Sequence, residues 1–210
     1  MRDRLGISPT VYGRKKKGNR VYYRLNANGS GEEFGVPERV VLFRWRKRIR
    51  KSYTFSGARL SPTFWRALPA ALGPDVASWH SLDIPEVLTR IASWKAKQQE
   101  ARDVVQAGNT PSIPKLPSAD VLHAIIHLCK PQTLQKLVAR HAQLAAINES
   151  GVPDLFLFAR DARNRVCMAQ FVEVKRPKEE MRPGQTAEHA FMYDLQLPVR
   201  KFVLRERPNP

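Results

Sequence analysis

The pattern of apolar and polar positions changes along the chain from short strands to helices and then to a hairpin. Apolar and aromatic runs at residues 20–25 and 39–46 are bounded by polar and glycine-rich segments, which predicts two strands. From residue 60 to 107 the apolar residues recur at helical spacing, and Ser61 and Asp83 are typical helix starts. This middle part of the chain is therefore expected to be helical.

A segment rich in proline and glycine, Gln106 to Pro117, is the predicted boundary between two domains. Further helices are expected from Ser118 onward and over residues 132–147. The pattern thus predicts a basic amino-terminal region at residues 1–110, with short strands followed by helices. A second domain is expected at residues 118–210.

The most informative stretch follows residue 150. The apolar run at residues 154–159 is entered through Gly151 and Pro153, and it is typical of a buried strand that begins with a carboxylate. The pattern then predicts a turn at residues 160–165, a strand at 166–175, a helix at 185–195 and a strand at 199–204.

Candidate catalytic side chains lie at the open end of this hairpin. Successive strand residues point to opposite faces, so Glu173 and Lys175 share one face, while Asp154 begins the neighbouring strand. Two carboxylates beside one ammonium group make a hard oxygen site of the kind that Mg²⁺ or Mn²⁺ prefers. A metal ion there would lower the pKa of a bound water and stabilise charge on a phosphoryl oxygen. The pattern indicates phosphodiester hydrolysis.

These residues also carry a resemblance to a known family. Asp154, followed nineteen residues later by Glu173-Val174-Lys175, resembles the PD-(D/E)XK nuclease signature. The flanking sequences GVPDL, FVEVKRP and MRPGQ, which begin at residues 151, 171 and 181, resemble the VRR-NUC family more closely. The resemblance covers the carboxyl-terminal part of the chain. It implies an α+β or α/β fold with a PD-(D/E)XK core, in which helices flank a mixed sheet.

The resemblance implies a metal-dependent nuclease that hydrolyses DNA phosphodiester bonds, expected to be an endonuclease with Mg²⁺ or Mn²⁺ as cofactor. Asp154 and Glu173 are the expected metal ligands, with a backbone carbonyl from Val174. Lys175 is expected to position the attacking water, and Gln185 to support the lysine or a phosphate. The family includes repair nucleases, phage nucleases and interbacterial DNase toxins, and all three roles stay open.

One position departs from the family pattern. Members often carry a glutamate on the helix before the Gly-Pro-Asp strand, where this chain has Gln132. Asp120 and Glu149 are the remaining candidates for a fourth site carboxylate. The missing acid is the best support for an alternative function, a non-catalytic basic DNA-binding protein that keeps a nuclease-like scaffold. The intact set of Asp154, Glu173 and Lys175 argues against this alternative. A ribosome- or RNA-associated protein would explain the charge and leave the carboxylates and lysine unexplained.

The charge favours a nucleic-acid partner. The 210 residues include 36 Lys and Arg against 19 Asp and Glu, which gives a formal net charge of +17. Such an excess attracts polyanions, and DNA is the expected partner. Residues 1–60 hold 16 of the basic and four of the acidic side chains. The expected nucleic-acid contacts are Arg14, Lys15, Lys16, Lys17, Arg44, Arg46, Lys47, Arg48, Arg50 and Lys51.

No membrane partner is expected, because the sequence has no apolar run of spanning length. A signal-peptide pattern is also absent, which predicts a cytoplasmic protein; delivery into another cell stays open. The two cysteines, Cys129 and Cys167, lack metal-ligand spacing, in keeping with a reducing compartment. A toxin would require an acidic immunity protein that covers the basic site.

Overall fold

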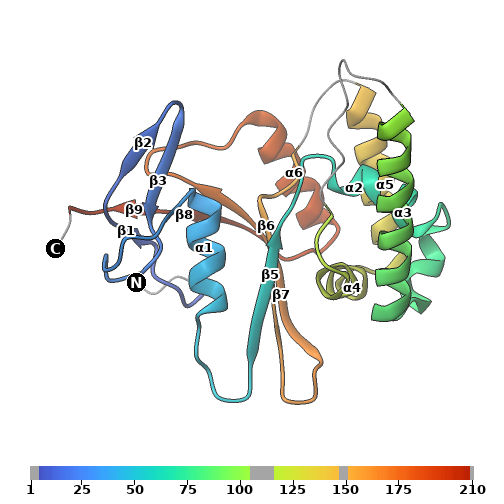
Figure 1. Cartoon of the computed structure of the whole chain (residues 1–210), viewed down its shortest axis with the longest axis horizontal. Helices are drawn as coiled ribbons and strands as arrows, with labels where there is room; N and C mark the ends of the chain where they lie inside the picture. Colours follow the sequence, from blue (N-terminus) through green and yellow to red (C-terminus); the bar gives the residue numbers. More distant parts are fainter. Residues whose placement is uncertain (1–4, 105–115, 147–150, 209–210) are drawn as a thin grey trace. The chain divides into compact units, whose positions relative to one another are not determined.

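The computed structural model describes residues 5–104, 116–146 and 151–208. The chain forms two compact units, one of residues 1–59 and 153–210 and one of residues 60–152. The second unit is therefore an insertion between two segments that fold together (Figure 1). This division differs from the expected boundary near residue 110, because the first 59 residues fold with the carboxyl-terminal hairpin. Most of the expected linker, Gln106 to Pro117, lies outside the described residues.

The first unit is built on a mixed four-stranded sheet. The strands follow the order β5 (Thr54–Arg59), β6 (Leu155–Arg160), β7 (Val166–Lys175) and β8 (Val199–Val203). The first two pairings are antiparallel and the pairing of β7 with β8 is parallel. The parallel connection contains α6 (Pro183–Asp194), which packs against β8. A mixed sheet with flanking helices confirms the predicted fold class.

Alternation along the central hairpin creates two buried faces. Leu155 and Leu157 of β6 join Val172 and Val174 of β7 in the main apolar core. The intervening phenylalanines form an aromatic cluster on the opposite face, since the Phe156 ring lies 5.8 Å from that of Phe158 and 5.0 Å from that of Phe171. Burial of both faces explains why this stretch is a nearly continuous apolar run.

The strand predicted at residues 39–46 is wrong, because these residues belong to helix α1 (Pro37–Arg46). Its buried side chains, Val40, Val41, Arg44 and Trp45, recur at the helical spacing of four residues. Pro37 occupies the first turn, where its missing N–H costs nothing. The β-branched and aromatic residues that indicated a strand instead form the helix face that packs on the sheet.

Trp45 fastens α1 to the sheet. Its indole Nε1 donates to the carbonyl oxygens of Ser56 at 2.8 Å and Phe158 at 3.1 Å, one on each of two neighbouring strands. The strands approach closely here, because a Cβ on Gly57 would lie 2.4 Å from the Phe156 carbonyl oxygen. A side chain at residue 57 would therefore push β5 away from β6.

The remaining strands of this unit are short. They are β1 (Thr10–Val11), β2 (Lys15–Lys17), β3 (Arg20–Arg24), β4 (Phe34–Gly35) and β9 (Arg205–Glu206). β2, β3 and β4 form one small sheet, and β1 pairs with β9. Leu5, Val11 and Tyr23 share one core with the residues of β6 and β7. The amino-terminal segment thus wraps the hairpin unit, and the strand predicted at residues 20–25 is confirmed.

Arg44, one of the expected nucleic-acid contacts, is buried in the core of this unit. Its guanidinium donates to the carbonyl oxygens of Ser8, Thr10, Arg24, Leu25 and Asn26. Burial lowers its pKa to about 10. Arg44 therefore cannot reach nucleic acid, and its charge holds the amino-terminal loops on α1.

Arg44→Leu is expected to destabilise the protein by about 3 kcal/mol, because several buried carbonyl groups would lose a charged donor. Urea unfolding followed by tryptophan fluorescence measures the change. Lys47→Leu is the matched control, since it removes the same charge from an exposed position. Equal stability of the two variants would contradict a structural role for Arg44.

The inserted unit is helical, as predicted. It contains α2 (Phe64–Leu72), the 3₁₀ helix η1 (Val76–Ser81), α3 (Ile84–Val104), α4 (Ala119–Leu128) and α5 (Pro131–Ala146). Asp83 and Glu86 form a reciprocal cap at the start of α3, each carboxylate accepting the other residue's backbone N–H. Trp65 and Trp79 are completely buried. Within the described residues, no helix is both long and apolar enough to cross a membrane.

Candidate active site

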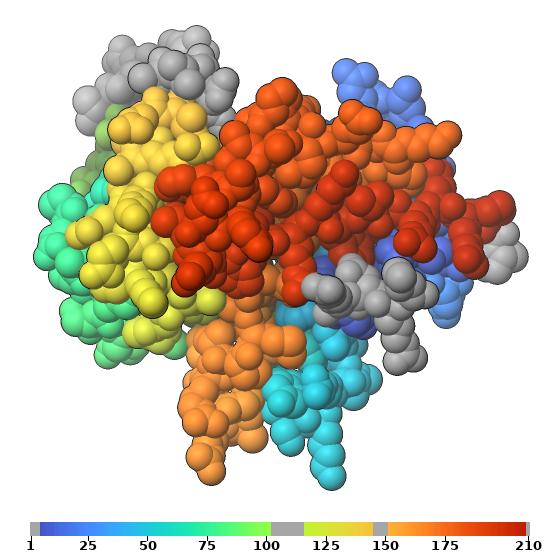
Figure 2. Space-filling view, turned by 180° about the vertical axis from the view of Figure 1, so that it is seen from behind, coloured from blue at the N-terminus to red at the C-terminus, as the bar shows by residue number. Residues whose placement is uncertain are grey.

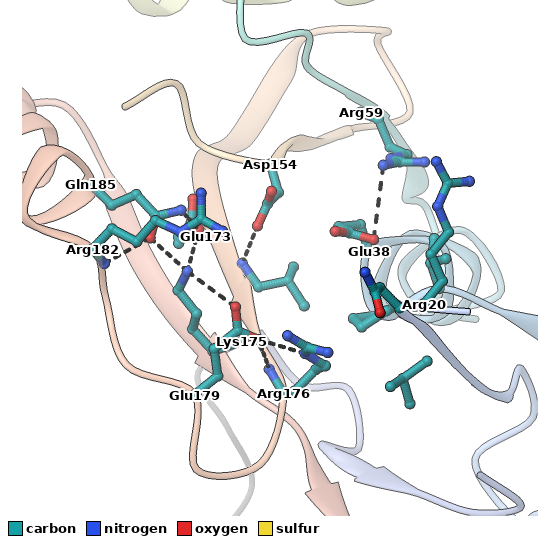
Figure 3. A pocket seen from close by; sticks show the side chains of 15 residues that line it. Arg20, Glu38, Arg59, Asp154, Glu173, Lys175, Arg176, Glu179, Arg182 and Gln185 are labelled. Atoms are coloured by element: carbon teal, nitrogen blue, oxygen red, sulfur yellow. Dashed lines mark hydrogen bonds and ion pairs between the residues drawn. The ribbon is translucent and has the colours of Figure 1, made fainter. Parts of the chain in front are cut away.

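A pocket of about 450 Å³ opens where β6 begins and β7 ends (Figure 3). It lies entirely within the first unit. Five residues singled out from the sequence line it, namely Asp154, Glu173, Val174, Lys175 and Gln185. Six further charged side chains line it from other segments, namely Arg20, Glu38, Arg59, Arg176, Glu179 and Arg182.

Strand register brings the two carboxylates of the hairpin together. Leu155 pairs with Val172, so Asp154 and Glu173 occupy the next opposed positions of the antiparallel ladder. The Asp154 carboxylate accepts the backbone N–H of Val174 at 2.8 Å. This bond fixes the carboxylate at the rim of the hairpin, beside the second strand.

Lys175 forms an ion pair at the bottom of the pocket. Its Nζ lies 2.9 Å from Glu173 Oε1, and the two side chains are 3% and 1% exposed. Nζ also donates to Gln185 Oε1 at 2.7 Å and lies 3.8 Å from Glu179 Oε1. Burial of a charge is costly unless such partners are present, so the ammonium group is tightly positioned.

Gln185 connects the hairpin to α6. It lies in the first turn of the helix, where its Oε1 accepts the backbone N–H of Arg182 at 3.0 Å. Its Nε2 donates to Glu173 Oε1. One amide therefore contacts both members of the Lys175–Glu173 pair and holds them against the start of the helix (Figure 3).

Burial raises the pKa values of the two hairpin carboxylates. Burial, followed by repulsion from Glu173, raises the pKa of Asp154 to about 7, and Glu38 adds to the repulsion. Burial also raises the pKa of Glu173, although Lys175 opposes the shift. Among the described residues, no donor reaches Glu38 Oε2 or Glu173 Oε2, and both oxygens are buried. A cation in the pocket would satisfy these oxygens.

Sequence reasoning missed two acidic residues of the pocket, Glu38 and Glu179. Glu38 comes from the amino-terminal part of the chain. It lies in the first turn of α1, and its Oε2 is 3.9 Å from Arg59 of β5. Only the assignment of residues 37–46 as a helix could have identified it. Of the positions considered instead, Gln132 and Asp120 belong to helices of the inserted unit, and Glu149 lies outside the described residues.

The chemistry of these oxygens suits a hard divalent cation. In residues 5–104, 116–146 and 151–208, no group of three or more His, Cys, Asp or Glu side chains is close enough to hold a metal ion. Mg²⁺, however, usually binds one or two carboxylates and completes its shell with waters and substrate phosphates. Asp154 and Glu173 offer such carboxylates. Val174, expected to lend its carbonyl, gives its N–H to Asp154.

The expected nucleic-acid contacts lie away from the pocket, and none of the ten lines it. Lys15, Lys16 and Lys17 are exposed on β2, and Arg14 is half-exposed with its Nη1 3.9 Å from Glu206. Arg46, Lys47, Arg48, Arg50 and Lys51 lie at or just after the end of α1. The four arginines that do line the pocket come from three separate segments, which explains why no local charge run revealed them.

Comparison with known proteins identifies the family. The VRR-NUC domain model matches residues 72–200, which is more than half of the chain and includes Asp154, Glu173, Lys175 and Gln185. Glu38 lies outside the matched segment. No curated protein matches the sequence.

Solved structures similar to this chain include two complexes of paFAN1 with DNA. A crystal structure of paFAN1 bound to a DNA with a 2-nucleotide 5′ flap and a gap gives a TM-score of 0.46 at 16% identity, over 81% of this chain and 35% of that chain. The complex with a 1-nucleotide flap gives 0.38 at 17% identity, over 73% and 33%. The chain thus spans about a third of the length of the paFAN1 chain. From the match over residues 72–200, the chain belongs to the VRR-NUC domain family.

Proposed function

We propose that the protein is a metal-dependent nuclease that hydrolyses DNA phosphodiester bonds as an endonuclease. The supporting observation is the convergence of Asp154, Glu173 and Lys175 in one pocket, where two buried oxygens, Glu38 Oε2 and Glu173 Oε2, have no hydrogen-bond donor among the described residues. A hairpin with a purely structural role gains nothing from buried, unsatisfied carboxylates, which cost free energy. Such strain is typical of functional sites.

Asp154 and Glu173 would hold Mg²⁺ or Mn²⁺, with the Val174 carbonyl as a further oxygen and Glu38 as the fourth acidic group of the pocket. The bound ion would supply a water of lowered pKa and a positive charge for the phosphoryl oxygens. Glu38 enters from α1 on the side of Arg59. It would therefore face the hairpin carboxylates across the space that the substrate enters.

Lys175 would orient the attacking water and stabilise negative charge that develops on the phosphate. Its contacts with Glu173 and Gln185 hold the ammonium group in one place before substrate binds. Preorganised charge of this kind is effective because it requires no rearrangement during the reaction. Gln185 would act by positioning Lys175.

The arginines around the carboxylates would bind the phosphates that flank the scissile bond. Arg20, Arg59 and Arg182 line the pocket, and the guanidinium group suits phosphate because it donates two parallel hydrogen bonds. With the net charge of +17, they would make binding depend steeply on salt. The alternative function is a non-catalytic DNA-binding scaffold, and it was supported by the absence of an acidic residue at Gln132. Because Glu38 brings another carboxylate into the pocket, that support is weaker.

A cleavage assay tests the proposal. Supercoiled plasmid and a branched duplex are incubated with the wild-type protein in Mg²⁺, in Mn²⁺ and in chelator. Metal-dependent nicking or linearisation of the plasmid is the expected result. Binding without cleavage in either metal would overturn the enzymatic function and leave the DNA-binding alternative. The relative rates on the two substrates would separate a general DNase from a nuclease specific for branched DNA.

Glu38→Gln is expected to lower the cleavage rate by about 10- to 100-fold, as for the loss of a group that supports a metal site. The rate is measured over a Mg²⁺ titration, because a weakened site should also require more metal. Asp120→Asn is the matched control, since Asp120 was the other described candidate for the fourth carboxylate. A larger effect of the Asp120 substitution would contradict the assignment of Glu38.

A further inference from the structure

Two basic loops lie side by side at the end of the sheet opposite the pocket. Residues 47–53 join α1 to β5, and residues 161–165 join β6 to β7. The loops are adjacent because Thr54 and Arg160, which border them, are paired across the antiparallel strands β5 and β6. Figures 1 and 2 show both loops projecting beyond the body of the first unit. We refer to residues 47–53 and 161–165 together as the prong.

The prong carries a concentrated positive charge. It has six basic side chains, Lys47, Arg48, Arg50, Lys51, Arg163 and Arg165, and one acidic side chain, Asp161. Asp161 is neutralised by Arg165, whose Nε and Nη2 donate to Asp161 Oδ2 at 3.0 and 2.8 Å. In the described part of the chain, the side chains of Lys51 and Arg163 form no hydrogen bond or ion pair. Their charges are therefore available to a ligand.

Local contacts restrict the conformation of both loops. The guanidinium of Arg48 lies 4.6 Å from the centre of the Phe55 ring, and the Arg50 carbonyl accepts the backbone N–H of Tyr53 at 3.0 Å. In the second loop, the Asp161 carboxylate accepts the backbone N–H groups of Arg163 and Arg165 at 2.9 and 3.0 Å. A loop that is already ordered loses less conformational entropy when it binds a ligand than a flexible loop does.

Ile49 projects from the basic loop into solvent. It is 100% exposed, more than any other large apolar side chain among the described residues. Its neighbours in the chain are Arg48 and Arg50. An apolar side chain flanked by cations suits a DNA groove, where the cations contact phosphates and the apolar group packs against or between bases.

The distance between the prong and the pocket determines how many base pairs separate the two contacts on a bound duplex. The ten residues of β7, Val166–Lys175, separate the prong from Lys175. At about 3.3 Å per residue the strand spans about 30 Å. Base pairs of B-DNA are about 3.4 Å apart, so the prong would reach a duplex about 8 to 9 base pairs from the scissile phosphate.

From this arrangement we infer that the prong is a second DNA contact, in which Lys51 and Arg163 bind phosphates and Ile49 enters a groove about 8 to 9 base pairs from the cleaved bond. The inference rests on the proposed function, since it assumes that DNA occupies the pocket. It predicts a minimum duplex length for tight binding. A duplex too short to reach the prong should lose these contacts.

The test compares the double variant Lys51→Ala/Arg163→Ala with the control pair Lys95→Ala/Lys97→Ala, which removes equal charge from exposed positions of α3. Affinity is measured by fluorescence anisotropy, with Ca²⁺ in place of Mg²⁺, for hairpin-capped stems of about 6 and about 20 base pairs, a choice that follows from the predicted reach. Unchanged thermal midpoints verify that all variants are folded.

We expect wild type and the control pair to bind the long stem at least about 10-fold more tightly than the short one, and the prong variant to lose most of this preference. The slope of log affinity against log salt should fall by about 2 in the prong variant on the long stem, since each phosphate contact contributes about 0.9. Ile49→Ser should lower affinity for the long stem and leave that slope unchanged.

A prong variant that keeps the wild-type length preference, or a control pair that loses as much, would overturn the inference. The proposed function is judged separately by plasmid cleavage. If wild type cleaves plasmid and the prong variant binds both stems as wild type does, only the prong assignment fails. If wild type neither cleaves plasmid nor binds either stem, the proposed function fails as well.

Discussion

Asp154→Asn should reduce DNA cleavage by at least about a thousandfold, because the substitution removes a negative charge from the centre of the proposed metal site. The same variant should unfold at an equal or higher temperature than the wild type. The Asp154 carboxylate is buried beside Glu173 and repelled by it, so replacement by a neutral amide of the same shape relieves repulsion. Loss of activity together with retained stability would identify a functional carboxylate.

Plasmid cleavage and thermal unfolding without added metal measure these two effects. Glu180→Gln is the matched control, because Glu180 is exposed close to the site in sequence and does not line the pocket. The control should cleave at the wild-type rate. Cleavage by the Asp154 variant within about 10-fold of wild type would be too fast for a metal ligand and would refute its role.

Lys175→Met should abolish cleavage and also destabilise the fold by about 3 kcal/mol, because the Glu173 carboxylate would lose its partner while remaining buried. The double variant Glu173→Gln/Lys175→Met should regain most of this stability, since a neutral pair needs no countercharge. It should regain no activity. Urea unfolding and plasmid cleavage on the same preparations separate the two consequences.

Lys201→Met provides the control for the loss of a lysine. Lys201 lies on β8, in register with Glu173, but its side chain is exposed to solvent. Because no buried partner within the described ranges depends on its charge, its replacement should change neither stability nor cleavage substantially. Recovered cleavage in the double variant would show that Lys175 serves only to neutralise Glu173. An unchanged stability in the single variant would contradict the tight ion pair.

The hairpin could be predicted because its determinants are local. β7 was predicted at its observed bounds of 166–175, since a polar turn precedes it and Pro177 follows two residues after its end. Alternation along this strand also placed Glu173 and Lys175 on one face. The same reasoning failed for α1, where Val40, Val41 and Trp45 have high strand propensity although tertiary packing makes them the buried face of a helix.

Long-range pairing had no local signal. β5 and β6 are neighbours in the sheet, yet residues 60–154 separate them in the chain. The sequence pattern therefore placed residues 1–59 and the hairpin in different domains. Glu38 was missed for the same reason, because it reaches the pocket from a segment more than a hundred residues before Asp154.

The insertion between β5 and β6 also determines when the pocket can form during synthesis. Glu38 and Arg59 emerge from the ribosome first, whereas Asp154, Glu173 and Lys175 emerge only after the whole helical unit has been translated. At about 5–20 residues per second, this delay is on the order of ten seconds. Nascent chains that stop within the helical unit therefore contain no hairpin carboxylate and cannot assemble the pocket. Interrupted translation should release inert fragments.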